Sequence, residues 1–371
     1  MCSYIFLLRR KGLVLETKPS IRSSIKKSIQ ERRGDVNLDV ASLTKASYLA
    51  PGKTFPLAIE PTMKGVNLAS WAAHNRDYVR GELDKHGAIL FRNFTVDSAE
   101  KFEEVARAIS IDGELFDEYG DLPRDDPGSK VYHSTPYPAD KSILFHNESS
   151  HMHRWPMKIF FYCVKPADGK GATPILDCRQ TYREIDPAII RRMTEKKLMY
   201  VRNFIDGLDV SWQQFFGTSN RKSVEDYCRK AGIEFQWKGE NGLTTRQISL
   251  AVAKHPHTGE MVFFNQIQLH HISCLDPDIK ASMLSMFQEE DLPRNVYYGD
   301  GTPIEDSVVA EISGVYDRLA TRFQWQKGDV IMLDNMMASH ARDPFEGTRK
   351  ILVAMAEIVS QKDVVTASSQ G

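Results

Sequence analysis

The sequence predicts an α+β fold in which strands dominate the middle and the end of the chain. Runs rich in β-branched and aromatic residues cluster at 143–178, 255–271 and 330–357, while amphipathic helical stretches stand before and between them. No GxGxxG motif follows a predicted strand and no GxxxxGK[ST] motif occurs. The nucleotide-binding α/β folds therefore lack their sequence signature.

The composition of the 371 residues is typical of a globular protein, with 42% hydrophobic and 26% charged residues. A formal net charge of −1 gives no global field that would attract nucleic acid or an anionic membrane. No apolar run approaches the roughly 18 residues of a membrane span. The five cysteines are scattered without a CxxC pair, which predicts free thiols and a cytoplasmic, reducing location. We expect a small-molecule substrate and no nucleic-acid or membrane partner.

The chain is predicted to hold one domain, because no Pro/Gly/Ser-rich linker divides it after about residue 55. Residues 1–55 are expected to form a partly flexible N-terminal extension. Its apolar patch precedes its basic residues, which is the reverse of a secretory signal. The domain is expected over 56–362, with a helical lid or insertion around 200–250, and a C-terminal tail over 363–371.

The first part of the domain combines helices with one strand. Residues 69–87 are predicted as a helix that ends at Gly87, and residues 88–94 as the strand after it. A second helix follows, with Asp97 as its expected N-cap and a buried face formed by Phe102, Val105, Ala106 and Ile109.

Later elements are predicted from the same patterns. Residues 158–166 and 172–178 are expected to be strands, and 218–231 a helix with Thr218 as its cap and Gly232 at its end. Residues 255–271 predict a hairpin that leads into a strand ending at His270 and His271, with His255 and His257 exposed beside the turn. Helices after Asp276 and around 308–319, and strands at 330–335 and 349–357, complete the pattern.

The segment ILFHNESSHMHRWP, residues 143–156, holds four potential metal ligands: His146, Glu148, His151 and His153. Alternate residues of an extended chain share a face, so His146 and Glu148 are expected to point together and Asn147 away. His151 and His153 can pair by the same argument. Such pairs are common by chance, so the segment alone indicates a metal without fixing its ligands.

A distant segment supplies the missing groups. His340 follows a hydrophobic strand, and Arg349 begins the next strand. Two histidines and one carboxylate hold iron on one face and leave three positions for a co-substrate and O2. A nearby arginine can form a bidentate pair with a carboxylate of that co-substrate.

Three segments in a fixed order carry a family resemblance: FHNESSH…WPMKIFFYCVKPADGKGATPILDCR, HPHTGEMVFFNQIQLHH and GDVIMLDNMMASHARDPFEGTRKILVAM. With them the chain resembles the iron(II)- and 2-oxoglutarate-dependent oxygenases of the taurine dioxygenase (TauD/TfdA) type. The resemblance is greatest to the branch around the syringomycin biosynthesis hydroxylase and clavaminate synthase, and it covers roughly residues 60–360. It implies a double-stranded β-helix (jelly-roll, cupin-like) core with flanking helices and iron at one open end.

The resemblance also implies roles for individual residues. His146, Glu148 and His340 would bind iron and form the catalytic centre. Thr173 would contact the 2-oxoglutarate carboxylate, and Arg349 would pair with it. Neighbouring strand residues face opposite ways, so only one of Arg349 and Lys350 can point inward. We favour Arg349, because a guanidinium fits the carboxylate fork.

Substrate contacts are implied for Asn265, Gln266 and His151, whereas His153 is expected to line the pocket or the surface. His270 and His271 have either a pocket or a structural role. The segment 200–250 is the expected place for substrate specificity.

The implied activity is hydroxylation of an unactivated C–H bond in an amino-acid-like substrate, free or carrier-tethered, in natural-product biosynthesis. Fe(II) would be the cofactor, with 2-oxoglutarate and O2 as co-substrates. Desaturation or cyclisation by the same chemistry stays open, whereas Glu148 argues against halogenation. Two rival hypotheses are a non-catalytic cupin-like binding protein and a zinc hydrolase in which His146, His151 or His153 binds zinc and Glu148 is the base.

Overall fold

The computed structural model describes residues 43–116, 130–134, 137–205 and 209–364. Residues from Thr44 onward form one compact unit. Most of the predicted N-terminal extension and C-terminal tail, together with Cys2, lies outside the described residues. The predicted α+β class is confirmed, because several sheets combine with helices that connect and cover them.

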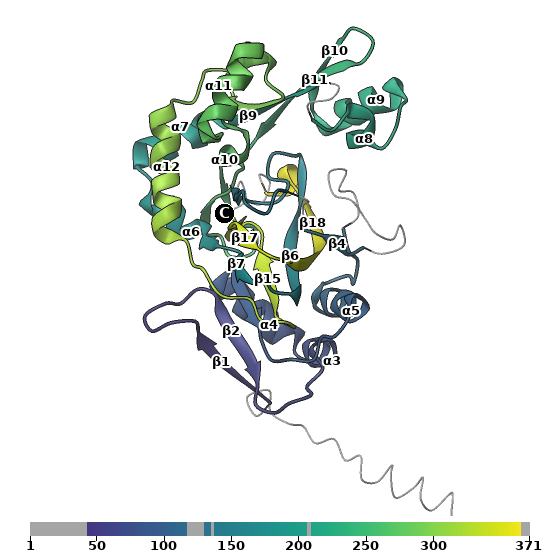
Figure 1. Ribbon diagram of the computed structural model, residues 1–371, viewed down its shortest axis with the longest axis vertical. Coiled ribbons are helices and arrows are strands. Elements are labelled where there is room, and N and C mark those ends of the chain that lie inside the picture. The colour runs from purple at the N-terminus through teal and green to yellow at the C-terminus, as the bar shows by residue number, and fades with distance from the viewer. Residues whose placement is uncertain (1–42, 117–129, 135–136, 206–208, 365–371) are drawn as a thin grey trace, which may run out of the picture. The chain divides into compact units, whose positions relative to one another are not determined.

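A seven-stranded sheet forms the centre of the unit (Figure 1). All neighbouring strands are antiparallel except β2 and β3. The strands, in their order across the sheet, are β1 Thr44–Tyr48, β2 Leu57–Pro61, β3 Ala88–Phe91, β15 Val330–Asp334, β6 Arg154–Lys165, β18 Lys350–Ser360 and β4 Tyr132–His133. β3 and β15 are buried along their whole length, which fits their almost entirely apolar sequences.

Three helices pack at this sheet: two lie against β3, β15 and β18, and the third packs against those two helices and against Phe91 of β3 through Trp71. They are α3 Leu68–His74, α4 Arg76–His86 and α5 Ala99–Ile109. The single helix predicted over 69–87 is wrong, because the chain breaks at Asn75, whose side chain donates to Trp71 O. Gly87 ends α4 in the left-handed conformation, as predicted. The N-cap of α5 is Ser98 rather than Asp97, since the Ser98 hydroxyl accepts from Lys101 N.

A three-stranded sheet carries the residues of the site. Its strands are β5 Ile143–His146, β16 Ala338–Arg342 and β8 Ile175–Asp177, with β16 in the middle. Two short strands pair with each other: β7 Gly169–Lys170, which lies between β6 and β8 in the sequence, and β17 Phe345–Glu346, which lies between β16 and β18. Both predicted strand regions, 158–166 and 172–178, thus contain strands.

A four-stranded sheet at the top of Figure 1 is formed by β10 Glu234–Lys238, β11 Gly242–Ser249, β9 Leu198–Phe204 and β14 Arg294–Tyr298. We call it the upper sheet. Two helices, α8 Trp212–Phe216 and α9 Arg221–Ala231, share with it a small core that includes Phe204, Val224 and Leu243. Asn220 rather than Thr218 caps α9, whereas Gly232 ends it as predicted. The predicted lid or insertion at 200–250 covers this region, apart from 206–208, which are not described.

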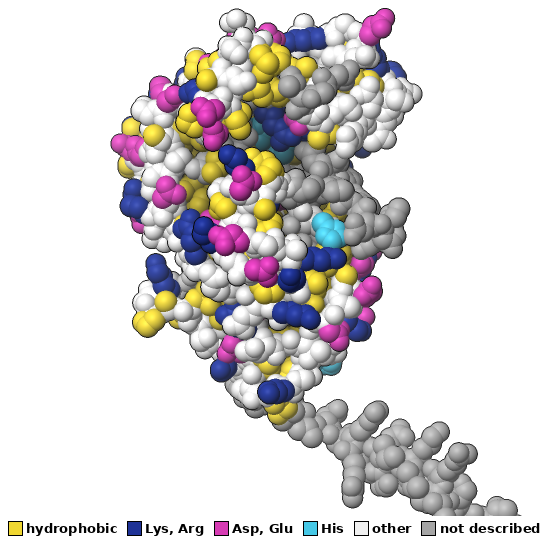
Figure 2. Space-filling model, viewed as in Figure 1, with side chains coloured by type: hydrophobic (Ala, Val, Ile, Leu, Met, Phe, Trp, Pro, Cys, Tyr) yellow, Lys and Arg dark blue, Asp and Glu magenta, His cyan; other side chains and the backbone are white. Residues whose placement is uncertain are grey.

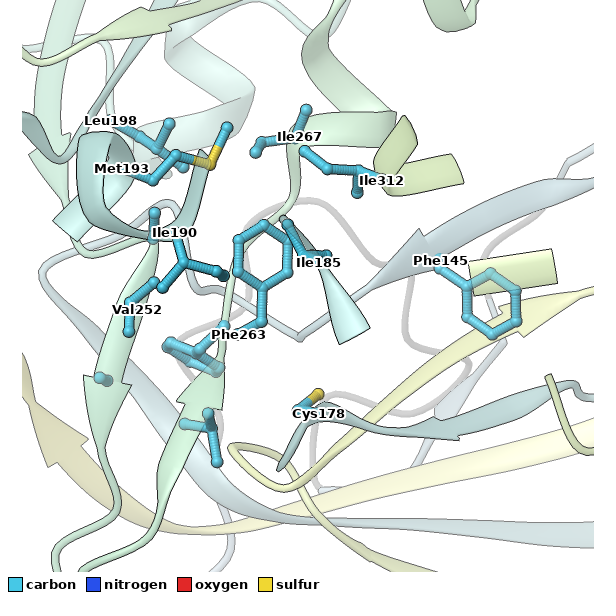
Figure 3. Close-up of a cluster of buried hydrophobic side chains, with 14 of the residues drawn as sticks. Phe145, Cys178, Ile185, Ile190, Met193, Leu198, Val252, Phe263, Ile267 and Ile312 are labelled. Carbon is cyan, nitrogen blue, oxygen red and sulfur yellow. The ribbon is translucent and has the colours of Figure 1, made fainter. Parts of the chain in front are cut away.

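The main apolar core lies among helices and short strands that pack next to the three-stranded sheet. Figure 3 shows Ile185, Ile190, Met193, Phe263, Ile267 and Ile312 gathered there, all of them buried. The elements that supply it are α6 Cys178–Glu184, α7 Pro187–Lys196, α10 Ile267–His270, α12 Asp306–Leu319 and the hairpin of β12 Val252–Lys254 with β13 Met261–Phe263. Helix α11 Pro277–Met286 and the 3-10 turns Ile272–Cys274 and Glu289–Asp291 complete the described elements.

The strand predicted to end at His270 and His271 is wrong. β13 stops at Phe263, and residues 267–270 form helix α10. The strand ends because Asn265 and Gln266 form hydrogen bonds with the turn at Asn147 and do not continue the hydrogen bonding between strands. Within the described ranges, no helix has the length and apolarity to cross a bilayer.

Candidate active site

Three predicted metal ligands meet at the end of the three-stranded sheet. His146 is the last residue of β5, and it pairs across the strands with His340 in β16. The two imidazole rings lie 4.3 Å apart between centroids, and His146 Nε2 is 3.9 Å from Glu148 Oε2. One potential ligand atom from each of the three residues lies within 4.8 Å of the others. The structure therefore brings together residues that are far apart in the sequence.

Glu148 reaches this cluster from a turn and not from the extended strand that we predicted. β5 ends at His146, and the backbone turns over the next residues, with Ser149 at a φ of 54°. Asn147 points away as expected, into the core, where its side chain donates to Asn335 O at 2.6 Å. The turn, rather than strand alternation, thus sets the direction of the Glu148 carboxylate.

Asn335, which the sequence analysis missed, clamps the backbone of Glu148. Its Oδ1 accepts from Glu148 N at 2.8 Å, and its Nδ2 donates to Glu148 O at 2.8 Å and to Pro156 O at 2.9 Å. The side chain is fully buried, so water cannot replace these bonds. Asn335 therefore holds the turn that carries the acidic ligand.

Asp334 and His255 support this clamp. Asp334 Oδ1 accepts from the amides of Met336 and Met337, and Oδ2 lies 3.1 Å from His255 Nε2. His255 Nδ1 accepts from Thr258 N, so Nε2 carries the proton and donates to Asp334. Burial raises the pKa of Asp334, but His255 and the two amides outweigh it and lower the pKa overall. The prediction that His255 is exposed is wrong, whereas His257 is exposed as predicted.

The two histidines are prepared to bind a metal cation. His146 Nδ1 lies 2.8 Å from Leu144 O, which makes Nδ1 the donor and leaves the lone pair of Nε2 for the centre of the cluster. Burial, followed by the nearby His146, lowers the pKa of His340 well below its usual value, so its imidazole is neutral. His340 Nδ1 is buried and finds no hydrogen-bond partner in the described part of the chain. Two imidazole nitrogens and a carboxyl group are a ligand set that fits a divalent iron.

A cationic pocket lies in the same cavity. Arg349 donates from Nε to Gly171 O at 3.1 Å and from Nη2 to Thr173 Oγ1 at 2.9 Å. No carboxylate among the described residues forms an ion pair with Arg349. Burial and the neighbouring charge of Arg342 lower the pKa of Arg349 to about 10, so it stays cationic at neutral pH. The cavity therefore offers an unneutralised guanidinium beside the metal cluster.

Thr173 is prepared to donate to an anion. Its Oγ1 accepts from Arg349 Nη2 and, at 3.0 Å, from Trp325 Nε1. Both neighbours are donors only, so the hydroxyl hydrogen has to point to a third group. Gly171 permits this arrangement, because its φ is +74° and an added Cβ would lie 2.8 Å from the Cβ atoms of Ala167 and Phe345.

The structure also distinguishes the basic residues around the pocket. Arg349 lines the cavity, whereas Lys350 is exposed and pairs with Lys165 across β18 and β6. Arg342, which the sequence analysis missed, lines the cavity as well, and its guanidinium donates to the carbonyls of Tyr137, Pro138 and Lys141. Arg342 lies two residues after His340 on β16, so strand alternation was a signal that could have found it.

The three residues expected to contact substrate, Asn265, Gln266 and His151, lie outside the lining of the metal-cluster cavity. Asn265 N and Gln266 Nε2 donate to the Asn147 side chain and backbone, so both residues brace the metal turn from behind. The ring of His151 lies against Tyr200 and His270, at 5.9 and 5.2 Å between centroids. None of the three is among the described residues that line the cavity of the metal cluster.

Comparisons with known proteins agree with this geometry. The model of the taurine catabolism dioxygenase TauD, TfdA family matches residues 48–355. The dapdiamide synthesis protein DdaC of Enterobacter agglomerans is 36% identical over 277 residues, which are 75% of this chain and 84% of that protein. A clavaminate synthase-like protein of Arabidopsis thaliana is 27% identical over 82% of this chain and 94% of its own length. The PvcB protein of Pseudomonas aeruginosa shares the fold, with a TM-score of 0.50 and 14% identity over 84% of this chain and 90% of that one.

Proposed function

Because the chain belongs to the TauD, TfdA family and is an iron(II)- and 2-oxoglutarate-dependent dioxygenase, we propose that it hydroxylates an unactivated C–H bond of an amino-acid-like small molecule. His146, Glu148 and His340 hold the Fe(II) in this proposal. Thr173 and Arg349 hold the distal carboxylate of 2-oxoglutarate. The observation that carries the assignment is the meeting of both groups in one cavity.

Each side chain has a defined task. His146 offers Nε2 because its Nδ1 is bound to Leu144 O, and the Asn335 clamp aims the carboxylate of Glu148. The Thr173 hydroxyl donates its hydrogen to the co-substrate carboxylate, and Arg349 supplies the counter-charge. The bound iron, with 2-oxoglutarate and O2, supplies the oxidising power for a C–H bond. Phe161, Ile351 and Val353 form apolar walls that exclude water from the cavity.

The sheet topology supports a jelly-roll core. We infer that the seven-stranded sheet and the three-stranded sheet of β5, β16 and β8 are the two sides of a double-stranded β-helix. The metal ligands then lie at one open end, where β5 and β16 pair at His146 and His340. We also propose the cytoplasm as the location, since the described cysteines, Cys163, Cys178, Cys228 and Cys274, are free thiols.

The substrate class rests on the relatives. One relative, 36% identical, is named for dapdiamide synthesis, and another for its likeness to clavaminate synthase. Both names support a biosynthetic role with an amino-acid-like substrate, free or carrier-tethered. Desaturation or cyclisation would use the same site, because the outcome depends on where the substrate radical is held.

An anaerobic titration tests the proposal. We expect Fe(II) and 2-oxoglutarate together to give a metal-to-ligand charge-transfer band, and admission of air to release succinate. A zinc hydrolase or a non-catalytic binding protein predicts neither signal. Absence of both the band and succinate would therefore reject the oxygenase proposal.

A further inference from the structure

A second arginine lies in the cavity of the metal cluster. Arg342 lines this cavity together with Arg349, Thr173 and the three proposed metal ligands. Only 7% of Arg342 is exposed, so its guanidinium is largely removed from water. It donates only to backbone carbonyls, and among the residues that the structure describes no carboxylate forms an ion pair with it. The cavity thus contains a second cation that the proposed function does not use.

The Arg342 guanidinium is held in a fixed position by one short segment, residues 137–141. Its Nη1 donates to Tyr137 O at 3.0 Å, and its Nη2 donates to Pro138 O at 2.6 Å and to Lys141 O at 2.7 Å. Its Nε is buried and has no hydrogen-bond partner within the described ranges. The carbonyls accept hydrogen bonds but carry no net charge. They therefore fix the guanidinium without neutralising it.

The two guanidiniums of the cavity lie close enough to act on the same ligand. The Cζ atom of Arg342 lies 5.2 Å from the centroid of the Phe345 ring, and that of Arg349 lies 5.9 Å from the same centroid. The two charges are therefore no further apart than the sum of these distances, about 11 Å. After burial, the charge of Arg342 is the next cause that lowers the pKa of Arg349 to about 10. An anion beside Arg349 is accordingly within the field of Arg342.

Basic side chains on the surface are in a different situation. Figure 2 shows Lys and Arg side chains interspersed with Asp and Glu over the visible face. Arg322, for example, binds Asp343, the residue after Arg342, and its side chain is 51% exposed. Such charges are paired and screened by solvent. The cavity has apolar walls, so the charges inside it are screened less.

The cavity also lacks a balancing negative charge. Its described lining includes two guanidiniums and a single carboxyl group, that of Glu148. Glu148 is a proposed ligand of a divalent cation and does not balance the arginines as well. A buried charge without a counter-charge is costly. We expect the balancing anion to come from a molecule that binds in the cavity.

We propose that Arg342 determines specificity for the co-substrate: its fixed charge, added to that of Arg349, makes the cavity select a 2-oxo acid with a distal carboxylate over one without it. This inference rests on the proposed function, in which Arg349 and Thr173 contact that carboxylate. Arg342 attracts the same carboxylate without touching it and keeps its own bonds to the carbonyls of residues 137–141.

The test compares 2-oxoglutarate with 2-oxopentanoate, which has the same carbon chain and the same chelating end but a methyl group in place of the distal carboxylate. Full-length enzyme is loaded anaerobically with Fe(II), and the affinity for each acid is measured from the charge-transfer band and by calorimetry. We expect the wild type to prefer 2-oxoglutarate. In Arg342→Gln this preference should fall about tenfold, the effect of a unit charge about 11 Å away at an effective dielectric constant of about 20.

Two further variants separate charge from structure. Arg342→Lys keeps the positive charge but loses the planar fork that binds three carbonyls, so it should retain most of the preference even where both affinities fall. Lys350→Gln is the matched control. Lys350 is the neighbour of Arg349 in the sequence but is exposed, so its charge is screened and its loss should not change the preference.

Three results would overturn the inference. The first is an unchanged preference in Arg342→Gln, with or without weaker binding of both acids, which would mean that Arg342 only holds residues 137–141 in place. The second is an equal loss of preference in Arg342→Lys and Arg342→Gln. The third is an equal loss in Lys350→Gln and Arg342→Gln, which would assign the effect to net charge alone.

Failure to fold and failure of the proposed function give different results. If Arg342→Gln does not fold, Arg342→Lys decides, because a preference like that of the wild type supports the inference and its loss in a variant that keeps the charge contradicts it. Absence of a charge-transfer band with either acid in the wild type would instead reject the proposed function.

Discussion

The metal site and the two facing arginines of the upper sheet, Arg202 and Arg294, are held by opposite means. At the metal site, uncharged and fully buried amides, Asn147 and Asn335, fix the turn of Glu148 through short bonds to the backbone. At these arginines, like charges face each other across two strands, and both guanidiniums bind the carboxylate of Asp209 at a partly exposed edge. Buried amide networks define one geometry, whereas partly exposed charges are more easily rearranged by a ligand or by solvent.

The two regions also differ in their cores. The proposed metal ligands line a cavity with Phe161, Ile351 and Val353 of the seven-stranded sheet. The upper sheet adds side chains of β9 and β14 to the main core, and only its end beside α8 and α9 has a separate small core. The difference teaches that the α8–α9 end of the upper sheet is packed apart from the metal cluster. We propose that substrate selection lies at that end, where the sequence can change without disturbing the proposed ligands. Substitutions in the first region should therefore remove activity with every substrate, and those in the second should change which substrate is used.

The largest effect is expected for His340→Ala. Loss of a ligand should lower iron affinity by more than about 100-fold, because loss of a group that only supports a ligand already costs about 10- to 100-fold. His151→Ala is the control: His151 packs against Tyr200 and His270 and should leave iron affinity unchanged. Iron content after equilibrium dialysis measures both. Tight iron binding by His340→Ala together with loss by His151→Ala would favour the zinc hydrolase.

A smaller effect is expected for Asn335→Ala. The substitution removes the two hydrogen bonds that hold the Glu148 backbone but leaves the three proposed ligand residues unchanged. Iron affinity should therefore fall about 10- to 100-fold. Asn203 in the upper sheet offers a matched control, because it is also buried and makes three hydrogen bonds, with Glu290 O, Leu292 O and the Thr244 hydroxyl. Asn203→Ala should lower the unfolding free energy by a comparable amount, but not the iron affinity. Equal iron affinity in both variants would show that Asn335 is only structural.

Sequence reasoning proposed those site residues whose signals are local or carried by motifs, and their roles stay predictions. His146, Glu148, His340, Thr173 and Arg349 all lie together in one cavity, as the family resemblance implied. Even so, a turn sets the direction of the Glu148 side chain. Strand alternation therefore paired His146 with Glu148 but predicted the wrong backbone conformation at Glu148.

Residues that act through distant partners were out of reach. Asn335 and His255 look like ordinary loop residues until the fold buries them against Glu148 and Asp334. The break at Asn75 was hidden because the apolar pattern continues through both α3 and α4. Local pattern reports which face is buried, and it does not report which buried polar groups find each other.

The smallest effect is expected for Trp325→Phe. The change keeps the packing of the ring but removes the N–H that donates to Thr173 Oγ1. The hydroxyl then gains freedom to turn from the co-substrate, and one hydrogen bond of about 1 kcal/mol corresponds to roughly a fivefold loss of 2-oxoglutarate affinity. Iron affinity should stay the same, because Trp325 touches no metal ligand through this bond.

Trp212→Phe in the upper sheet region is the control for this change. Trp212 is buried, and its Nε1 has no hydrogen-bond partner in the described residues, so its loss should not affect 2-oxoglutarate. If Trp325 acts through Thr173, the double variant Trp325→Phe, Thr173→Val should bind 2-oxoglutarate no more weakly than Thr173→Val alone. Additive losses in that cycle would mean that Trp325 supports the pocket by packing and does not direct the hydroxyl.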